Sequence, residues 1–166
     1  MSGTEAKAEE SDDYLIQDRH GLSDSELAVC LDLLDRGAAV NVETAATHLP
    51  TAIAQVVATH AGKIVGVGAV KRARPDYAAK ISRSSSHPID PATPELGYVT
   101  VDKKHRGKHL SSRMVSALIA ATSGRLFATT DKDEMKTVLS RNGFIKCGRD
   151  WDGDNGCLTL WMRQPD

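Results

Sequence analysis

The sequence has little of what marks membrane, secreted or nucleic-acid-binding proteins. No apolar run approaches the ~18–20 residues that a membrane span needs, and no basic-then-hydrophobic secretory signal occurs at its start. The three cysteines, at positions 30, 147 and 157, form no close pair, which favours reduced thiols and a cytoplasmic protein. Aromatic residues make up only 4% of the chain, too few for a base-stacking surface. These shortages argue against a membrane or a nucleic acid as a partner.

Acidic charge is concentrated at one end of the chain. The formal net charge is −1, but residues 1–13 hold five acidic residues against Lys7, which leaves the remainder mildly basic. Because this stretch has almost no apolar residues, we expect residues 1–12 to form a disordered acidic tail. The 166 residues are enough for one domain with a substantial core, which we place at residues 13–166.

Apolar periodicity and turn signals predict eleven helices and strands. The capping box Ser23-Asp24-Ser25-Glu26 begins the first helix, which continues through Leu34, and Ala61-Gly62-Lys63 joins two strands as a hairpin. Four prolines and a serine run predict a long loop over 73–94, and 150–156 reads as a turn. The other expected elements are strands at 14–17, 53–60, 64–72, 95–101, 125–129, 144–149 and 157–163, and helices at about 41–49, 107–123 and 131–142.

Basic residues gather where the helix at 107–123 begins. A helix N-terminus carries about half a positive charge and normally attracts Asp and Glu to its first turn. Positive charge on such an end is favourable when an anion is bound there, and the free N–H groups of a helix N-terminus bind phosphate. Residues 104–111 therefore predict a site for a phosphorylated ligand. The basic side chains are Lys103, Lys104, Arg106 and Lys108.

This segment resembles the acyl-CoA pyrophosphate loop of the GCN5-related N-acetyltransferase (GNAT) superfamily, whose pattern is Gln/Arg-x-x-Gly-x-Gly/Ala. Here the pattern appears as Lys104-His105-Arg106-Gly107-Lys108-His109, after Val101-Asp102-Lys103. Lys104 replaces the usual Gln or Arg, and His109 replaces a small residue. We expect His109 to lie in the first helical turn and to offer its N–H to the phosphate, with the imidazole pointing outward.

The resemblance implies an α/β (α+β) fold of the GNAT type. Its sheet is central, mixed and mostly antiparallel, flanked by helices, in the order β-α-α-β-β-β-α-β-α-β-β. It also implies acetyl-CoA as co-substrate and no metal. The pantetheine arm would bind the strand backbone at Val99, Thr100 and Val101. The residues implied to hold the diphosphate are Lys104, Arg106, Gly107, Lys108, His109, Leu110 and Ser111.

Glu95 is the candidate general base, because it lies six residues before Val101, the offset of the catalytic glutamate in GCN5-type enzymes. The alternative is a solvated glutamate at a strand start. Strand alternation places Glu95 and Tyr98 on opposite faces. Tyr98 is the candidate acid, although a core role fits it at least as well. The family's usual Tyr and Asn positions hold Leu139 and Lys132, so we expect catalysis without a dedicated acid.

The expected function is N-acetylation of a primary amine by direct attack in a ternary complex, with a small molecule or a peptide as acceptor. A non-catalytic CoA-binding or regulatory domain is the main alternative. A nucleic-acid binder is a second alternative, which the low aromatic content disfavours. That binder would use the basic loop with Arg72, Arg74, Lys80 and Arg83. The sequence leaves the identity of the acceptor and a homodimer open.

Overall fold

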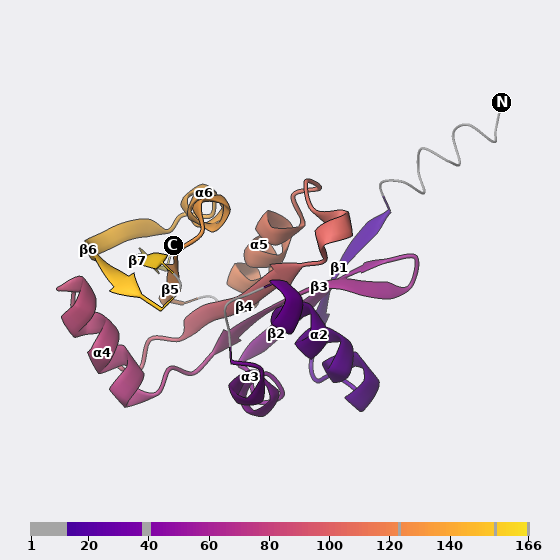
Figure 1. The fold of residues 1–166 in the computed structure, drawn as a ribbon, viewed down its shortest axis with the longest axis horizontal. Helices are drawn as coiled ribbons and strands as arrows, with labels where there is room; N and C mark the ends of the chain where they lie inside the picture. The colour runs from indigo at the N-terminus through magenta and orange to yellow at the C-terminus, as the bar shows by residue number, and fades with distance from the viewer. Residues whose placement is uncertain (1–12, 38–40, 123, 155, 166) are drawn as a thin grey trace.

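The computed structural model describes residues 13–37, 41–122, 124–154 and 156–165 (Figure 1). The expected acidic tail at 1–12 lies outside these residues. The eleven expected elements occur in the expected order, with two additions, α4 and a short 3₁₀ helix. In chain order the elements are β1 (Tyr14–Arg19), α2 (Asp24–Gly37), α3 (Val42–His48), β2 (Ala54–His60), β3 (Lys63–Lys71), α4 (Pro75–Ser85), β4 (Glu95–Val101), a short 3₁₀ helix (Lys103–His105), α5 (Leu110–Thr122), β5 (Leu126–Thr130), α6 (Asp133–Arg141), β6 (Ile145–Gly153) and β7 (Gly156–Arg163).

The sheet is mixed and mostly antiparallel, as expected. Its strand order is β1-β2-β3-β4-β5-β7-β6, and only β4 and β5 run parallel. Their register consists of one pair, Glu95 with Phe127, at the beginning of both strands. Beyond this pair, no strand of the described residues pairs with the remainder of β4 on that side.

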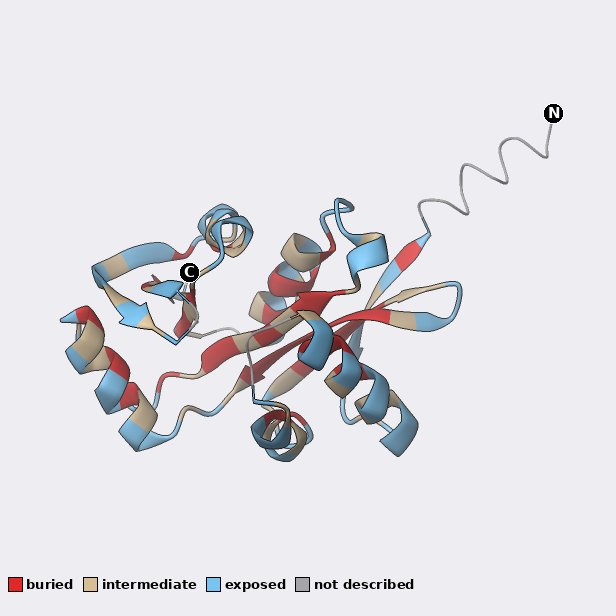
Figure 2. Ribbon diagram, in the orientation of Figure 1, coloured by how far each residue is buried: buried red, intermediate tan, exposed pale blue. Residues whose placement is uncertain are grey.

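Helices cover both faces of the sheet (Figure 1). α5 and α6 pack on one face, where Met114, Leu118 and Leu139 are buried against strand residues. On the other face α2 and α3 form a second cluster with β2, β3 and Tyr98, and α4 forms a third with β5 and β7. Figure 2 shows the buried residues concentrated along the central strands, between these layers. No helix of the described residues is long and apolar enough to cross a membrane.

The predicted capping box is present at the start of α2. The Glu26 amide donates to Ser23 Oγ at 3.2 Å, and the Ser23 amide donates to Glu26 Oε1 at 2.9 Å. These bonds satisfy two of the N–H groups that a helix start leaves free, which is typically worth about 1 kcal/mol. Leu22 and Leu27, on either side of the box, pack against the cluster beneath α2.

The prediction of a loop over residues 73–94 was wrong, because the first half of this segment forms α4. Pro75 occupies the first helical turn, where its missing N–H has no intrahelical partner to lose. Ala78, Ile81 and Ser85 form the buried face of α4. The helix ends at Ser86, which is left-handed with a φ of 57°. Pro75 therefore begins a helix, whereas the prolines of this segment were interpreted as signs of a loop.

α4 lies against the β6–β7 hairpin, which is longer than predicted. Residues 150–153, expected as a turn, continue β6, and Trp151 pairs with Leu158. At Gly148 (φ 70°) an added Cβ would overlap the backbone oxygen of Ser85. The Arg149 Nε also donates to the Ser84 carbonyl at 3.1 Å. These close backbone contacts hold α4 on the hairpin.

Candidate active site

A β-bulge in β4 reverses the predicted faces of the strand. Gly97 pairs with Ala69 and Thr100 pairs with Val67, so two residues of β4 lie opposite one residue of β3. The bulge includes Tyr98, which has a φ of 54°. Alternation therefore shifts by one residue after Gly97, and the prediction that Glu95 and Tyr98 lie on opposite faces was wrong. Both side chains line the same pocket.

This pocket is a cavity of about 220 Å³ on the face of the sheet covered by α2, α3 and α4. Its wall combines side chains that the sequence separates widely, from the start of α3 to the middle of β4. The lining residues are Asn41, Thr44, His48, Lys71, Arg72, Ala73, Arg74, Tyr77, Glu95 and Tyr98. A small concave site with a few converging polar groups is the usual form of a ligand-binding pocket.

Glu95 is buried at the bottom of this wall, with only 6% of its surface exposed. Lys71 Nζ lies 3.4 Å from Oε1, and the Tyr77 hydroxyl donates to Oε2 at 3.3 Å. Burial raises the pKa of the Glu95 carboxyl, and the neighbouring Lys71 and Tyr77 oppose that rise. The result is a carboxylate of increased basicity, held in one orientation beside a pocket.

Tyr98 is part of the core and also lines the pocket. Its ring packs in the cluster under α2 and α3. Lys71 Nζ lies 4.1 Å from the centre of the ring, in cation–π geometry. Lys71 therefore connects Glu95 and Tyr98 through its charge.

The predicted phosphate loop begins with the 3₁₀ helix and ends at α5. The Asp102 carboxylate accepts the Lys104 amide at 3.0 Å. Gly107 (φ 83°) and His109 (φ 60°) are both left-handed, so α5 begins at Leu110, three residues later than predicted. His109 therefore precedes the helix, and the expectation of a first-turn position was wrong.

Backbone amides are the main unsatisfied groups of this loop. Among the described residues, the first backbone bond at the start of α5 runs from the Arg113 amide to the His109 oxygen, at 3.1 Å. As at any helix start, the amides of Leu110, Ser111 and Ser112 precede the first bond of α5 and have no intrahelical acceptor. They lie at the positive end of a 13-residue helix, an arrangement suited to an anion.

The side chains expected at the diphosphate differ in their availability. Lys104, Lys108 and His109 are exposed, Ser111 is half-buried and Leu110 is buried in the core. The Arg106 Nε donates to the Val101 carbonyl at 3.2 Å, so this side chain folds back over the end of β4.

On β4 itself, Val99 and Val101 pack toward α5. Thr100 is buried on the opposite face, close to Gly37 of α2.

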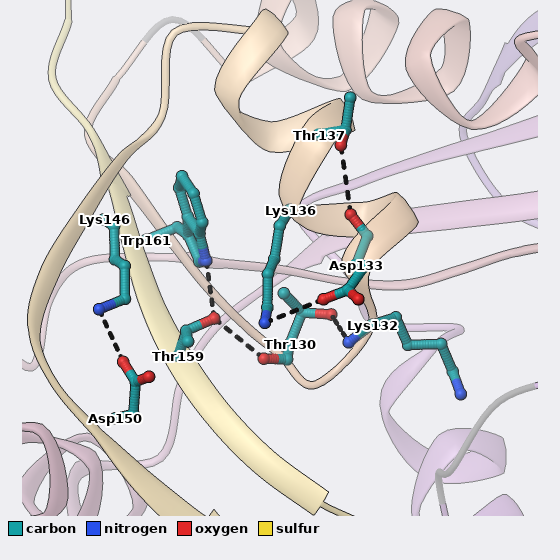
Figure 3. Close-up of polar contacts among 9 residues, drawn as sticks. All are labelled: Thr130, Lys132, Asp133, Lys136, Thr137, Lys146, Asp150, Thr159 and Trp161. Atoms are coloured by element: carbon teal, nitrogen blue, oxygen red, sulfur yellow. Dashed lines mark hydrogen bonds and ion pairs between the residues drawn. The ribbon is translucent and has the colours of Figure 1, made fainter.

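At the family's usual acid and asparagine positions, the structure has a leucine of the core and an exposed lysine. Leu139 is fully buried in the core. Lys132 is exposed before α6, and Figure 3 shows its side chain extending away from the neighbouring contacts. Its amide donates to Thr130 Oγ1 at 3.1 Å, while the Thr159 hydroxyl donates to the Thr130 carbonyl at 3.0 Å (Figure 3). Trp161 Nε1 donates to Thr159 at 2.8 Å. This network fixes the end of β5, across the gap from β4.

Sequence reasoning missed Tyr77 and Lys71. Tyr77 was assigned to a loop and Lys71 fell within the strand predicted at 64–72, and neither carries a motif. The spacing of Tyr77, Ala78 and Ile81 behind Pro75 is the signal that would have revealed a helix with one apolar face. The Glu95 contacts depend on tertiary packing and have no signal of their own. No cluster of three or more His, Cys, Asp or Glu side chains that could hold a metal occurs among the described residues.

The fold is shared with solved acetyltransferases. An acetyltransferase of the GNAT family from Streptococcus agalactiae superposes with a TM-score of 0.72 at 14% identity, over 91% of this chain and 96% of that one. The ribosomal-protein-S18-alanine N-acetyltransferase from Escherichia coli gives 0.65 at 13% identity, over 93% and 95%. A GNAT family acetyltransferase from Elizabethkingia anophelis with acetyl-CoA bound gives 0.62 at 13% identity, over 92% and 99%. No curated protein sequence matches the chain.

The family model of the Acetyltransferase (GNAT) family matches residues 27–140, well over half of the sequence. The chain belongs to the GNAT acetyltransferase family.

Proposed function

We propose that the protein is an N-acetyltransferase that moves the acetyl group of acetyl-CoA to a primary amine by direct attack in a ternary complex. The position of Glu95 carries this proposal. Its buried carboxylate, whose pKa is raised, faces a pocket at one end of β4, and the other end of β4 leads into the predicted phosphate loop. An acceptor in the pocket and a coenzyme on the loop would then meet along one strand.

The coenzyme would be held mainly by backbone groups. The amides of the first turn of α5, with Lys104 and Lys108 nearby in the loop, suit the two phosphates. The β4 backbone at Val99–Val101 faces the gap left by β5 and would receive the amide groups of the pantetheine arm. The relative from Elizabethkingia anophelis binds acetyl-CoA within the same fold, which supports this assignment.

Each step of the transfer has a group to perform it. Glu95 accepts a proton from the ammonium of the acceptor, directly or through a water, and the free nitrogen attacks the thioester carbonyl carbon. A β4 backbone N–H stabilises the tetrahedral oxyanion. The attacking nitrogen gives up its second proton to solvent as the C–S bond breaks, and the coenzyme leaves as a thiolate that takes a proton from solvent, or from Tyr98, which solvent then reprotonates. A thiolate is stable enough near neutral pH to leave without a dedicated acid.

Calorimetry with acetyl-CoA tests the coenzyme site. Gly107→Glu should weaken binding by tens of fold, because the new carboxylate repels the diphosphate. Gly21→Glu is the control: Gly21 also has a positive φ (142°) and open surroundings, and it follows β1 at the end away from Tyr14, whose hydroxyl contacts His105 of the loop. Equal affinities of the two folded variants would refute the loop assignment.

The missing acid at Leu139 favours the second candidate, a non-catalytic CoA-binding domain. The two functions differ in one measurement, the release of free CoA in the presence of an amine. An amine-dependent release that saturates with acetyl-CoA establishes the enzyme. Tight acetyl-CoA binding without release for any class of amine establishes the binding domain.

A further inference from the structure

The pocket beside Glu95 has an excess of positive charge. Three of its lining side chains are basic, Lys71, Arg72 and Arg74. Glu95 is the only acidic residue of the lining. The charge of the pocket is therefore opposite in sign to what a polyamine or another multiply cationic acceptor would need.

The Lys71 charge is already used within the protein. Its ammonium pairs with Glu95 at 3.4 Å and lies over the Tyr98 ring. Lys71 and Glu95 therefore compensate one another, and they leave the two arginines as the uncompensated charge of the site.

Neither arginine has a partner of its own in the described part of the chain. Arg72 and Arg74 are exposed at the pocket mouth, and no carboxylate, hydroxyl or carbonyl of the described residues accepts a bond from either guanidinium. They are two residues apart in the segment between β3 and α4, and the backbone at Arg74 is extended, with φ −72° and ψ 143°. Residues two apart on extended backbone point to the same side, which agrees with both of them lining one cavity.

The size of the cavity limits what can enter it. At about 220 Å³ it is smaller than the ~300–1,000 Å³ typical of pockets for drug-sized ligands. It suits a small amine with one further functional group.

We propose that the acceptor is a small amine that also carries a carboxylate, with the carboxylate bound by Arg72 and Arg74 at the mouth of the pocket and the amine directed to Glu95. This inference rests on the proposed acetyl transfer and names its acceptor class. Guanidinium groups match the planar geometry of a carboxylate and bind it through paired hydrogen bonds. The two ends of the acceptor would thus be recognised by groups of opposite charge, and a diamine would meet repulsion at the arginines.

Matched acceptors provide the test. The wild-type protein with acetyl-CoA is offered glycine and glycinamide, β-alanine and β-alaninamide, 1,3-diaminopropane and phosphoethanolamine, and CoA release is measured. We expect kcat/KM to be about 10- to 100-fold higher for each acid than for its amide, because hydrogen bonds to charged partners are lost with the carboxylate. The amides have the less basic amines and so more free amine near neutral pH, which biases the comparison against this result.

Substitutions test whether Arg72 and Arg74 cause the preference for the acid over its amide. Arg72→Gln and Arg74→Gln should each raise KM for the preferred acid about tenfold and leave the amide within about twofold. Arg83→Gln is the control, since Arg83 is an exposed arginine of α4 outside the pocket. The proposal would be overturned if the wild-type protein had equal kcat/KM for the acid and its amide. It would also be overturned if the arginine variants lost kcat/KM equally for both acceptors. Faster turnover of phosphoethanolamine than of either acid would contradict the preference for a carboxylate and show that the arginines prefer a phosphate group on the acceptor.

A binding measurement separates this proposal from the transfer itself. If no amine releases CoA, calorimetry of β-alanine and β-alaninamide against the CoA-bound protein still decides the matter. If β-alanine binds more tightly than β-alaninamide, and this difference disappears in Arg72→Gln, the proposed acceptor class is supported. The proposed catalysis would in that case be refuted. Absence of any preference for the acid refutes the acceptor class as well.

Discussion

The phenol of Tyr77 donates a hydrogen bond to Glu95 Oε2 at 3.3 Å, which joins α4 to the first residue of β4. Burial, followed by the nearby Glu95 charge, raises the pKa of Tyr77, so the phenol stays protonated and remains a donor. The candidate base thus depends on a helix that contributes no motif to the sequence. The predictions below follow from the surroundings of Glu95 and from two unusual backbone positions.

Replacement of Glu95 by Gln should separate chemistry from coenzyme binding. Turnover of an accepted amine should fall by roughly 10²–10⁴ near neutral pH, the usual contribution of a positioned base. Acetyl-CoA affinity should stay within a few-fold, because Glu95 lies at the opposite end of β4 from the loop. Steady-state kinetics and calorimetry on the same preparation measure both. An unchanged rate across pH would remove Glu95 from the mechanism.

Lys71→Met should move the pH profile of kcat/KM. The Glu95 carboxyl must be ionised to accept a proton, and Lys71 lowers its pKa against the larger effect of burial. Without that cation the pKa rises further, so the acid limb of the profile should shift to higher pH. Tyr77→Phe should shift it in the same direction by a smaller amount. An acid limb that stays in place in both variants would mean that another group controls it.

The same substitution has a pH-dependent effect on stability. A carboxyl whose pKa is higher in the folded state than in the unfolded chain contributes stability that is present below the unfolded value and lost as pH rises through the folded value. Without Lys71 the pKa of Glu95 in the folded state rises further, so the protein loses more stability as the pH rises. Chemical denaturation should therefore show Lys71→Met to be more destabilising at pH 7 than at pH 4. Equal destabilisation at the two pH values would contradict the coupling.

His109→Gly tests whether the loop acts through its backbone. A left-handed conformation costs a non-glycine residue roughly 1–2 kcal/mol, and glycine relieves this strain but loses more chain entropy on folding. We expect the free energy of unfolding to change by less than about 1 kcal/mol, and acetyl-CoA to bind as well as before or better. A large loss of affinity in calorimetry would show that the imidazole itself contacts the ligand.

Gly148→Ala should destabilise the protein through the contact between α4 and β6. A Cβ at this position overlaps the Ser85 oxygen and also strains a φ of 70°. Gly62→Ala shares the strain (φ 77°) but has no neighbouring atom. Thermal or chemical denaturation should show Gly148→Ala to be the less stable of the two by about 2 kcal/mol, within the range of overpacking effects. Equal stabilities would mean that α4 moves freely away from the hairpin.

Local signals predicted most of the fold. The capping box at Ser23, the Gly62 turn and the apolar stripe of α5 each act over a few residues, and each is where the sequence indicated. α4 was missed because Pro75 both stops a preceding element and begins a helix, and only the burial of Ala78 and Ile81 on the hairpin decides between these roles.

The candidate site was predicted less completely than the fold. Glu95 and the loop at 104–111 follow from spacing along one strand and one helix. The bulge at Tyr98 depends on the register of β3, and the Lys71 and Tyr77 contacts depend on how three elements pack. No sequence pattern over a short window contains that information.

The seating of α4 on the hairpin gives the C-terminal residues a part in the acceptor pocket. No residue after Tyr98 lines that pocket, yet Gly148 and Arg149 hold the helix that carries Tyr77. The residues that shape this pocket therefore come from two stretches that lie far apart in the sequence, residues 41–98 and 148–149. A mutagenesis library that varies only the residues lining the pocket would leave out the β6–β7 hairpin. A substitution in the hairpin can tilt α4 and so change the direction of the Tyr77 hydroxyl.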